Sequence, residues 1–130
     1  LVGSEMCIRD SLWISMTRLP PGARVVTHYH TGHVYAVTLQ GRWFYEESPE
    51  EVSEAGSYLF EPAGSTHTLC TPADVEGDTI VWFAVFGANI NLGEDGEVLS
   101  VVDAHAALEM YETYCDALGL DCSSLIVHGR

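Results

Sequence analysis

Short apolar or alternating runs recur along the chain from Leu12 to Val102, and turn residues separate them. The runs are rich in β-branched and aromatic residues, which are the types enriched in strands. We expect about eight strands, from the runs LWISMTR, RVVTHYH, VYAVTLQ, RWFYEE, SYLFEP, HTLC and TIVWFAVFGANI and from NLGEDGEVLSVV, which carries a hairpin-like turn at Glu94–Gly96. Short strands at this spacing are typical of a sandwich or a small barrel, so the pattern predicts an all-β fold.

The pattern changes to a helical one after the last of these runs. Asp103 is a good N-cap residue, and Gly119 is a typical helix terminator. Between them apolar residues fall at helical spacing: Ala107, Leu108, Tyr111, Cys115 and Leu118. We therefore expect one amphipathic C-terminal α-helix beside the β domain.

The chain is expected to divide into three parts. Residues 1–11 have no clear periodicity, and LVGSEMCIRD resembles translated adapter sequence. We therefore expect residues 1–11 to be a non-native or disordered segment, in which case the native protein would begin further upstream. Residues 12–102 form the expected β domain, and residues 103–130 form the helix and tail. The acidic stretch Glu46–Glu54 is predicted to be a solvated surface loop.

Composition narrows the possible partners. With 47% hydrophobic and 18% charged residues, the chain is too apolar for disorder, yet it has no apolar run of the ~20 residues that a membrane-spanning helix needs. Five Lys and Arg residues oppose 19 Asp and Glu residues, which gives a net charge of -14. Nucleic acid and anionic membrane surfaces would be repelled, so we expect neither as a partner.

The four cysteines, at positions 7, 70, 115 and 122, form no C-x-x-C pair. This absence argues against a zinc ribbon and against a thioredoxin-like redox pair. We expect reduced, mostly buried thiols and, from them, a cytoplasmic protein.

Three histidines carry the chemistry that the sequence predicts. His28 and His30 stand two residues apart in an expected strand, so both side chains project from one face. Pro62-x-Gly64-x-x-His67 places a third histidine just after a turn, where a strand could return beside the first pair. Three neutral imidazoles can bind one divalent cation at ~2.0–2.2 Å and leave positions open for other ligands.

The spacing of these residues resembles the two sequence motifs of the cupin superfamily. The first block runs from Gly22 through His28-x-His30 and Val34 to Gly41, and the second runs from Gly56 through Pro62-x-Gly64 to His67. The resemblance implies a conical, antiparallel, jelly-roll-like β-barrel with the metal near its middle.

This chain departs from the cupin pattern at two positions. Val34 stands where the pattern has a metal-binding glutamate, and Thr71 stands where the second motif ends in asparagine. The sequence therefore predicts a carboxylate-free site of His28, His30 and His67. Three imidazoles leave a divalent ion with about +2 charge, which favours an anionic, chelating small-molecule substrate.

Longer stretches resemble the 2,4'-dihydroxyacetophenone dioxygenase family: HYHTGHVYAVTLQGRWFYEE, EAGSYLFEPAGSTHTL and VLSVVDAHAALEMYETYCDALG. This resemblance implies a non-haem Fe(II) enzyme that uses O2 to cleave the carbon-carbon bond beside an aryl hydroxyketone or β-diketone-like carbonyl. It implies His28, His30 and His67 as the iron ligands, with Zn, Ni, Mn or Cu as alternative metals. A homodimer is expected by the same analogy.

Two other functions stay open on the same site. One is a metal-dependent binding or sensor module without turnover, like the cupin domains of anti-sigma factors. The other is isomerisation or hydrolysis with a metal other than iron.

The remaining candidate residues receive structural interpretations. His33, His105 and His128 are expected at the surface, although His33 could also be a fourth ligand or an acid-base group. Arg42 and Glu61 could reach the pocket, but we leave both outside the catalytic set, and Cys70 is expected to pack just outside it. Trp43 and Tyr45 share one face of their strand, so they or the opposite set should line the barrel.

Overall fold

The computed structural model describes residues 4–7 and 11–128, with side chains for 11–127. It contains thirteen strands and one helix in these ranges. Their bounds are β1 Ser4–Cys7, β2 Leu12–Leu19, β3 His28–His30, β4 Val34–Gln40, β5 Arg42–Tyr45, β6 Ser48–Glu54, β7 Tyr58–Glu61, β8 Thr66–His67, β9 Leu69–Cys70, β10 Thr79–Phe86, β11 Asn89–Leu92, β12 Val98–Val102, α1 Ala104–Leu118 and β13 Ile126–His128.

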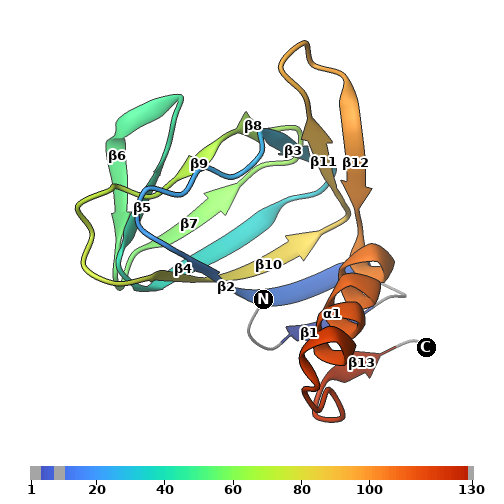
Figure 1. Ribbon diagram of the computed structural model, residues 1–130. Helices are drawn as coiled ribbons and strands as arrows, with labels where there is room; N and C mark the ends of the chain where they lie inside the picture. The colour runs from blue at the N-terminus through green and yellow to red at the C-terminus, as the bar shows by residue number, and fades with distance from the viewer. Residues whose placement is uncertain (1–3, 8–10, 129–130) are drawn as a thin grey trace.

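The strands form three sheets that face one another across a common interior. The six-stranded sheet has the order β13-β1-β2-β10-β4-β7, the four-stranded sheet β12-β11-β3-β8, and the three-stranded sheet β6-β5-β9. All the pairings are antiparallel except that of β1 with β13. Figure 1 shows β2, β10 and β4 along the lower side of the molecule, with β3, β8 and β9 above them. The predicted all-β, jelly-roll-like barrel with one helix is confirmed in this arrangement.

The interior follows from the alternation of side chains along each strand. In β2, Trp13, Ser15 and Leu19 are buried, and Val81 and Val85 of the neighbouring β10 are buried on the same face of the sheet. Two hydrophobic clusters result, one around Trp13 where α1 packs and one around Trp43. The cavity described below lies between these clusters.

Two strand predictions need correction. The acidic stretch predicted as a loop contains β6, which pairs with β5 even though its residues are mostly exposed. The long run TIVWFAVFGANI is two strands, because the chain bends at Gly87, where φ is 78°. A side chain at Gly87 would collide with the hydroxyl of Thr31, so glycine is needed for the chain to leave β10 and enter β11.

The predicted helix is confirmed with its caps. The Asp103 carboxylate accepts a hydrogen bond from the backbone N–H of Ala106, and Gly119 adopts a left-handed conformation at φ 64°. The helix covers one end of the barrel beside β12 (Figure 1). Among the described residues, no helix has both the length and the apolar character to cross a membrane.

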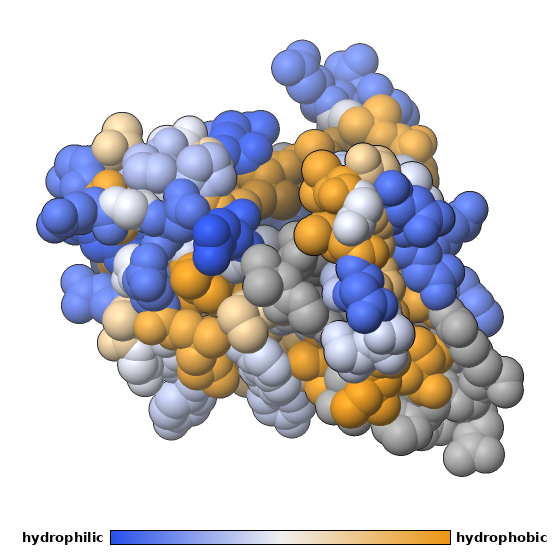
Figure 2. Space-filling model, turned by 60° about the horizontal axis from the view of Figure 1, so that its bottom comes forward, coloured by the Kyte–Doolittle hydropathy of each residue, from blue (hydrophilic) through white to orange (hydrophobic). Residues whose placement is uncertain are grey.

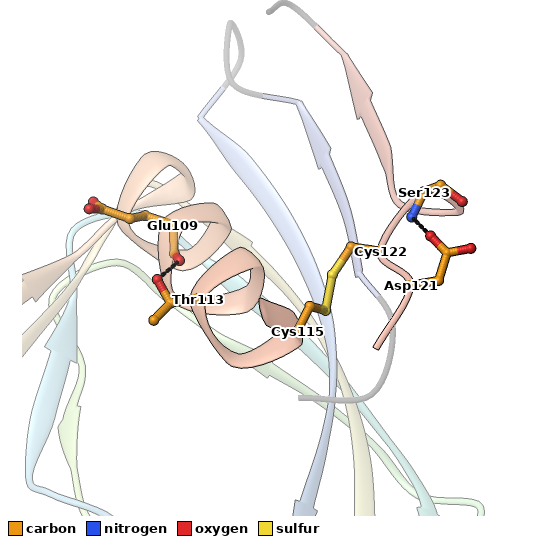
Figure 3. Close-up of a disulfide and its surroundings, with 6 residues drawn as sticks. All are labelled: Glu109, Thr113, Cys115, Asp121, Cys122 and Ser123. Atoms are coloured by element: carbon orange, nitrogen blue, oxygen red, sulfur yellow. Dashed lines mark hydrogen bonds between the residues drawn. A yellow bond between two sulfur atoms is a disulfide. The ribbon is translucent and has the colours of Figure 1, made fainter. Parts of the chain in front are cut away.

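The cysteine prediction is wrong for two of the four residues. Cys115, in the last turns of α1, forms a disulfide with Cys122 in the segment that follows (Figure 3). Cys70 is a free, buried thiol, as expected. The cytoplasmic expectation therefore loses the support that it took from reduced thiols.

The two ends of the chain meet at the same sheet edge. β1 lies within the segment 1–11 and pairs with β2, and β13 adds to the other side of β1. The segment 103–130 thus contributes a strand to the large sheet as well as the helix.

The outward side of the six-stranded sheet carries many apolar side chains. Cross-strand register places Trp82 beside Met16 and Val37, and Tyr35 beside Phe60. We call this set the outer face; its members are Ile14, Met16, Tyr35, Val37, Tyr58, Phe60, Ile80 and Trp82. Figure 2 brings the underside of the molecule forward and shows apolar and weakly polar residues over its lower part, whereas hydrophilic ones gather toward the upper left and the right.

Candidate metal centre

The three predicted histidines meet inside the barrel. His28 and His30 are the ends of β3, and both are buried because Tyr29 between them points the other way. β3 pairs with β8 so that His28 lies directly opposite His67. One ring nitrogen from each histidine lies within 4.8 Å of the others, and the Nε2 atoms of His30 and His67 are 3.1 Å apart. Register and alternation together bring the trio to one point.

A tight turn places His67. Gly64 has φ 84°, a left-handed conformation that favours glycine, and its N–H donates to the carbonyl of His30 at 2.7 Å. The Ser65 hydroxyl closes the turn by donating to the Pro62 carbonyl at 2.6 Å. The Pro-x-Gly spacing seen in the sequence thus anchors the third histidine to the strand that carries the other two.

The imidazoles are held in the form that binds cations. The Nδ1 of His28 donates to the Val26 carbonyl at 2.8 Å, which leaves the lone pair on Nε2. Burial lowers the pKa of His28 and lowers the pKa of His67 to about 4. Tyr45 stacks on His67 with ring centroids 4.2 Å apart. Neutral, oriented rings are what a divalent metal requires of histidine ligands.

The carboxylate of Glu61 lies beside the three histidines. Glu61, at the end of β7, is buried, and its Oε2 is 3.1 Å from the Nε2 of His30 and 3.4 Å from the Nε2 of His67. The three histidines by themselves form the predicted ligand group, and a carboxylate that was not expected lies next to it. The available signal was the strand alternation in SYLFEP, which places Glu61 and Leu59 on the same, inward face.

The cluster opens onto a cavity of about 220 Å³. Its walls are mostly apolar and come from β2, β10, β12 and α1 on one side and from the β5 and β9 region on the other. The lining residues besides the cluster are Trp13, Ser15, Thr17, Leu19, Val25, Tyr45, Leu69, Phe83, Val85, Asn89, Val102, Ala107 and Met110. The sequence left open which side of this strand lines the barrel; Trp43 and Tyr45 are the set that faces inward, with Trp43 packed behind Tyr45.

Asn89 is the second polar residue that the sequence did not single out. It is the first residue of β11, lies opposite His30 in the sheet and lines the cavity. Its Oδ1 is buried and has no hydrogen-bond partner. An unpaired amide oxygen beside the histidines is available to a ligand.

The other candidates lie away from the cluster. His33 stacks on Phe86 at 4.2 Å and is half-buried, so the expected full exposure is wrong, and it is not one of the clustered residues. His105 is exposed, as predicted, and the side chain of His128 lies outside the described residues. Arg42 pairs with Asp74 at 2.8 Å and is not among the residues that line the cavity. Cys70 is buried and does not line the cavity either, as expected.

The two departures from the cupin pattern have structural roles. Val34 is buried in the cluster of apolar residues around Trp13. The Thr71 hydroxyl donates to the Pro20 carbonyl and accepts from the Ala23 N–H, so it ties down the loop before β3.

The donor set suits a divalent metal. Three imidazole nitrogens converge, at least one ring is oriented by a backbone carbonyl, and both oxygens of the buried Glu61 lack a hydrogen-bond partner. A buried carboxylate without a partner is costly, and a cation would remove that cost. The three-histidine cluster in this fold therefore suggests a divalent metal site.

Comparison with known proteins agrees with this fold. No curated protein matches the chain. A protein of unknown function with a cupin-like fold from Ralstonia eutropha JMP134 has a TM-score of 0.89 and 34% identity over 97% of this chain and 77% of that chain. An RmlC-like cupin protein from the same organism has a TM-score of 0.80 and 30% identity over 90% of this chain and 74% of its own.

A more distant structure, an acetylacetone dioxygenase from Acinetobacter johnsonii, shares the fold at a TM-score of 0.73 and 18% identity over 82% of this chain and 71% of that chain. The family model described as the ChrR cupin-like domain matches residues 5–89, which is more than half of the chain. The chain therefore belongs to the ChrR cupin-like domain family.

Proposed function

We propose that the protein is an Fe(II)-dependent dioxygenase that cleaves a carbon-carbon bond in an aryl hydroxyketone or β-diketone-like substrate. One observation carries the proposal: three buried imidazoles, His28, His30 and His67, converge at the wall of a largely apolar cavity. Zn, Ni, Mn and Cu remain alternative metals, because the affinity of such a site for divalent ions rises along the first transition series whichever metal the reaction uses.

The cavity supports a small, largely apolar substrate. At about 220 Å³ it is smaller than the 300–1,000 Å³ typical of pockets for drug-sized ligands. Trp13, Tyr45 and Phe83 offer ring faces and edges to an aryl group. An apolar wall also excludes water, which would otherwise compete for the reactive position.

The proposed division of work assigns binding and orientation to the protein. His28, His30 and His67 would hold the ion, and Fe(II), when bound, would supply the electron transfer to O2. The histidines contribute no negative charge, so the centre attracts an anionic, chelating substrate such as an enolate. Tyr45 keeps His67 in place by stacking on its ring.

Asn89 supports a substrate that carries a hydroxyl group. Its unpaired Oδ1 can accept a hydrogen bond from a hydroxyl that lies next to a carbonyl held at the histidines. A diketone in its enolate form offers no such donor. We therefore favour hydroxyketones over diketones as the substrate class.

The test is oxygen consumption after anaerobic reconstitution with Fe(II), over a panel of aryl hydroxyketones and β-diketones. We expect uptake with hydroxyketones, one O2 per substrate cleaved, and loss of uptake when Zn(II) replaces Fe(II). No uptake with any member would contradict the dioxygenase proposal. Conversion of the substrate that Zn(II) restores without O2 uptake would instead indicate isomerisation or hydrolysis.

The second candidate is a metal-dependent binding or sensor module without turnover. Membership in the ChrR cupin-like domain family and the exposed outer face favour it, because a regulator needs a surface for its partner. A ligand that binds tightly to the metal-loaded protein without consuming O2 would support this function over the enzyme.

For partners, we propose that two copies associate through the outer face. Tyr58 and Phe60 are 87% and 54% exposed there, and its members carry no charge; Arg18, opposite Ile80 at its border, is paired with Asp78. A chain of net charge -14 can approach its copy most easily through an uncharged surface. Analytical ultracentrifugation should find a dimer that Phe60→Glu dissociates and that Val98→Glu, on β12, does not; a wild-type monomer would contradict this.

We also propose a cytoplasmic location, where a reducing environment keeps Fe(II) available. The Cys115–Cys122 disulfide would then be reduced in the cell, since cytosolic thiols are rarely oxidised. Alkylation and mass spectrometry of freshly lysed cells would measure this; an oxidised pair would contradict the location.

A further inference from the structure

We propose that Glu61 is a fourth metal ligand, so that the centre consists of three histidines and one carboxylate supplied from β7. The inference rests on the proposed function, because it requires that the cluster bind a divalent ion. It also explains where the carboxylate lies in a chain that has Val34 at the position of the cupin glutamate. Val34 and Glu61 are directly opposite residues of β4 and β7, so the carboxylate enters the barrel from the neighbouring strand.

The distances between the donor atoms fit ligands of one ion. Two donors that each lie about 2.1 Å from an ion, at angles of about 90° to 110°, are about 3.0–3.4 Å apart. The Nε2 atoms of His30 and His67 are 3.1 Å apart, and the Oε2 of Glu61 is 3.1 Å and 3.4 Å from these two nitrogens. Each pair among the three atoms has the separation expected of adjacent ligands.

The chemical environment of Glu61 leads to the same conclusion. Its side chain is 5% exposed, and neither carboxylate oxygen has a hydrogen-bond partner although two histidine nitrogens are near. The Nε2 atoms of His30 and His67 are close enough for a hydrogen bond, and together with the Oε2 of Glu61 they surround one point. A carboxylate that is buried without a hydrogen-bond partner is costly unless a positive charge lies close to it. A divalent cation at the shared point would supply it.

A carboxylate ligand changes the substrate that the site prefers. Three imidazoles and one carboxylate leave a divalent ion with about +1 charge, instead of about +2. A singly charged enolate then gives a neutral complex inside an apolar cavity, whereas a dianion does not. The preferred ligand class is therefore a chelating monoanion.

The test compares Glu61→Gln with the wild type in two measurements: the Zn(II) dissociation constant from chelator competition, and the visible absorption of the Co(II) form. The control is Glu47→Gln, which removes an equal charge near His67 but from a carboxylate that binds the N–H and hydroxyl of Thr68. Circular dichroism and thermal melting establish that each variant is folded.

We expect Glu61→Gln to weaken Zn(II) binding by more than about 100-fold, beyond the 10- to 100-fold loss typical of residues that only orient a ligand. The Co(II) bands should change to those of a lower coordination number. Glu47→Gln should keep the wild-type spectrum and affinity. The double variant Val34→Glu, Glu61→Val should recover part of the affinity, because it returns a carboxylate from the opposite strand.

Two results would overturn the inference. One is an unchanged Co(II) spectrum in folded Glu61→Gln, whatever its affinity, because the carboxylate would then lie outside the coordination sphere. The other, if Glu61→Gln does not fold, is a Zn(II)-minus-apo infrared difference spectrum of the wild type without a carboxylate change. A wild type that binds no divalent ion would overturn the proposed function itself, which is a distinct outcome.

Discussion

Val34 and Glu61 lie directly opposite each other on β4 and β7, and both side chains point into the barrel. The first packs among apolar residues near α1, and the second reaches the Nε2 of His30 at 3.1 Å. A valine thus occupies the position where the cupin motif has a glutamate, and a carboxylate enters the interior from the neighbouring strand instead.

Replacement of Asn89 by Leu should impair the reaction of hydroxyketones selectively. The unpaired Oδ1 is lost without a large change in volume, and a hydrogen bond of about 1–3 kcal/mol to the substrate hydroxyl disappears, so kcat/KM should fall about 5- to 150-fold. β-Diketones should be affected much less. Asn91→Leu, on the same strand but bonded to Ser100, is the control. An equal loss for both substrate classes would contradict the assigned role of Asn89.

Replacement of His30 by Ala should abolish tight metal binding and leave the barrel folded. The core clusters around Trp13 and Trp43 do not include the histidines, so the strands keep their packing. Metal content after gel filtration should fall from one equivalent to almost none, with an unchanged far-ultraviolet circular dichroism spectrum. Replacement of the exposed His105 by Ala should change neither measurement. A variant that unfolds would mean that the metal is structural.

The fold and the trio of histidines follow from local patterns. Alternation alone places His28 and His30 on one face, and the turn at Pro62-x-Gly64 brings His67 back beside them, so sequence spacing was sufficient. The role of Glu61 was harder to predict, because it depends on the register of β7 against β4 and β3 against β8, which no short segment encodes.

Other misses have the same physical origin. β6 has no apolar alternation, since it is an exposed edge strand that exists through its pairing with β5. The disulfide requires that the chain after Gly119 return to the end of α1, and cysteine spacing does not reveal such a return. The break at Gly87 depends on the close approach of Thr31, a residue far away in sequence.

The Trp43 side chain should be the most costly aromatic residue to remove. It is 1% exposed, and its indole N–H donates to the Thr38 hydroxyl at 2.8 Å. Trp43→Ala should lower the free energy of unfolding by about 3–5 kcal/mol, through a cavity and a lost hydrogen bond. Tyr114→Ala, at an exposed position on α1, should cost less than about 1 kcal/mol. Urea denaturation measures both; similar values for the two variants would contradict the assigned core.

Apo-protein stability should depend on pH in a defined window. The pKa of His67 falls from an ordinary 6.5 to about 4 in the folded state because of burial, and the pKa of His28 falls in the same direction. Between these values the unfolded chain binds more protons than the folded chain, so the free energy of unfolding rises with pH. Stability should therefore be lost as the pH falls from about 6.5 towards 4.

Denaturant titrations of chelator-treated protein across this range measure the slope, and His67→Gln is the control, with a smaller slope. Stability that is constant or increases as the pH falls would show that burial does not keep these imidazoles neutral. The metal-bound protein should resist acid further, because the ligands must lose the ion before they take up protons.

The most direct measurement is X-ray absorption at the metal edge of protein loaded with one equivalent of Zn(II). We predict a first shell of nitrogen and oxygen donors at about 2.0–2.2 Å, with multiple scattering from three imidazoles. The His30→Ala protein should lose this signature. A wild-type spectrum with fewer than three imidazoles, or an ion bound elsewhere and unaffected by the substitution, would contradict a metal centre built on His28, His30 and His67.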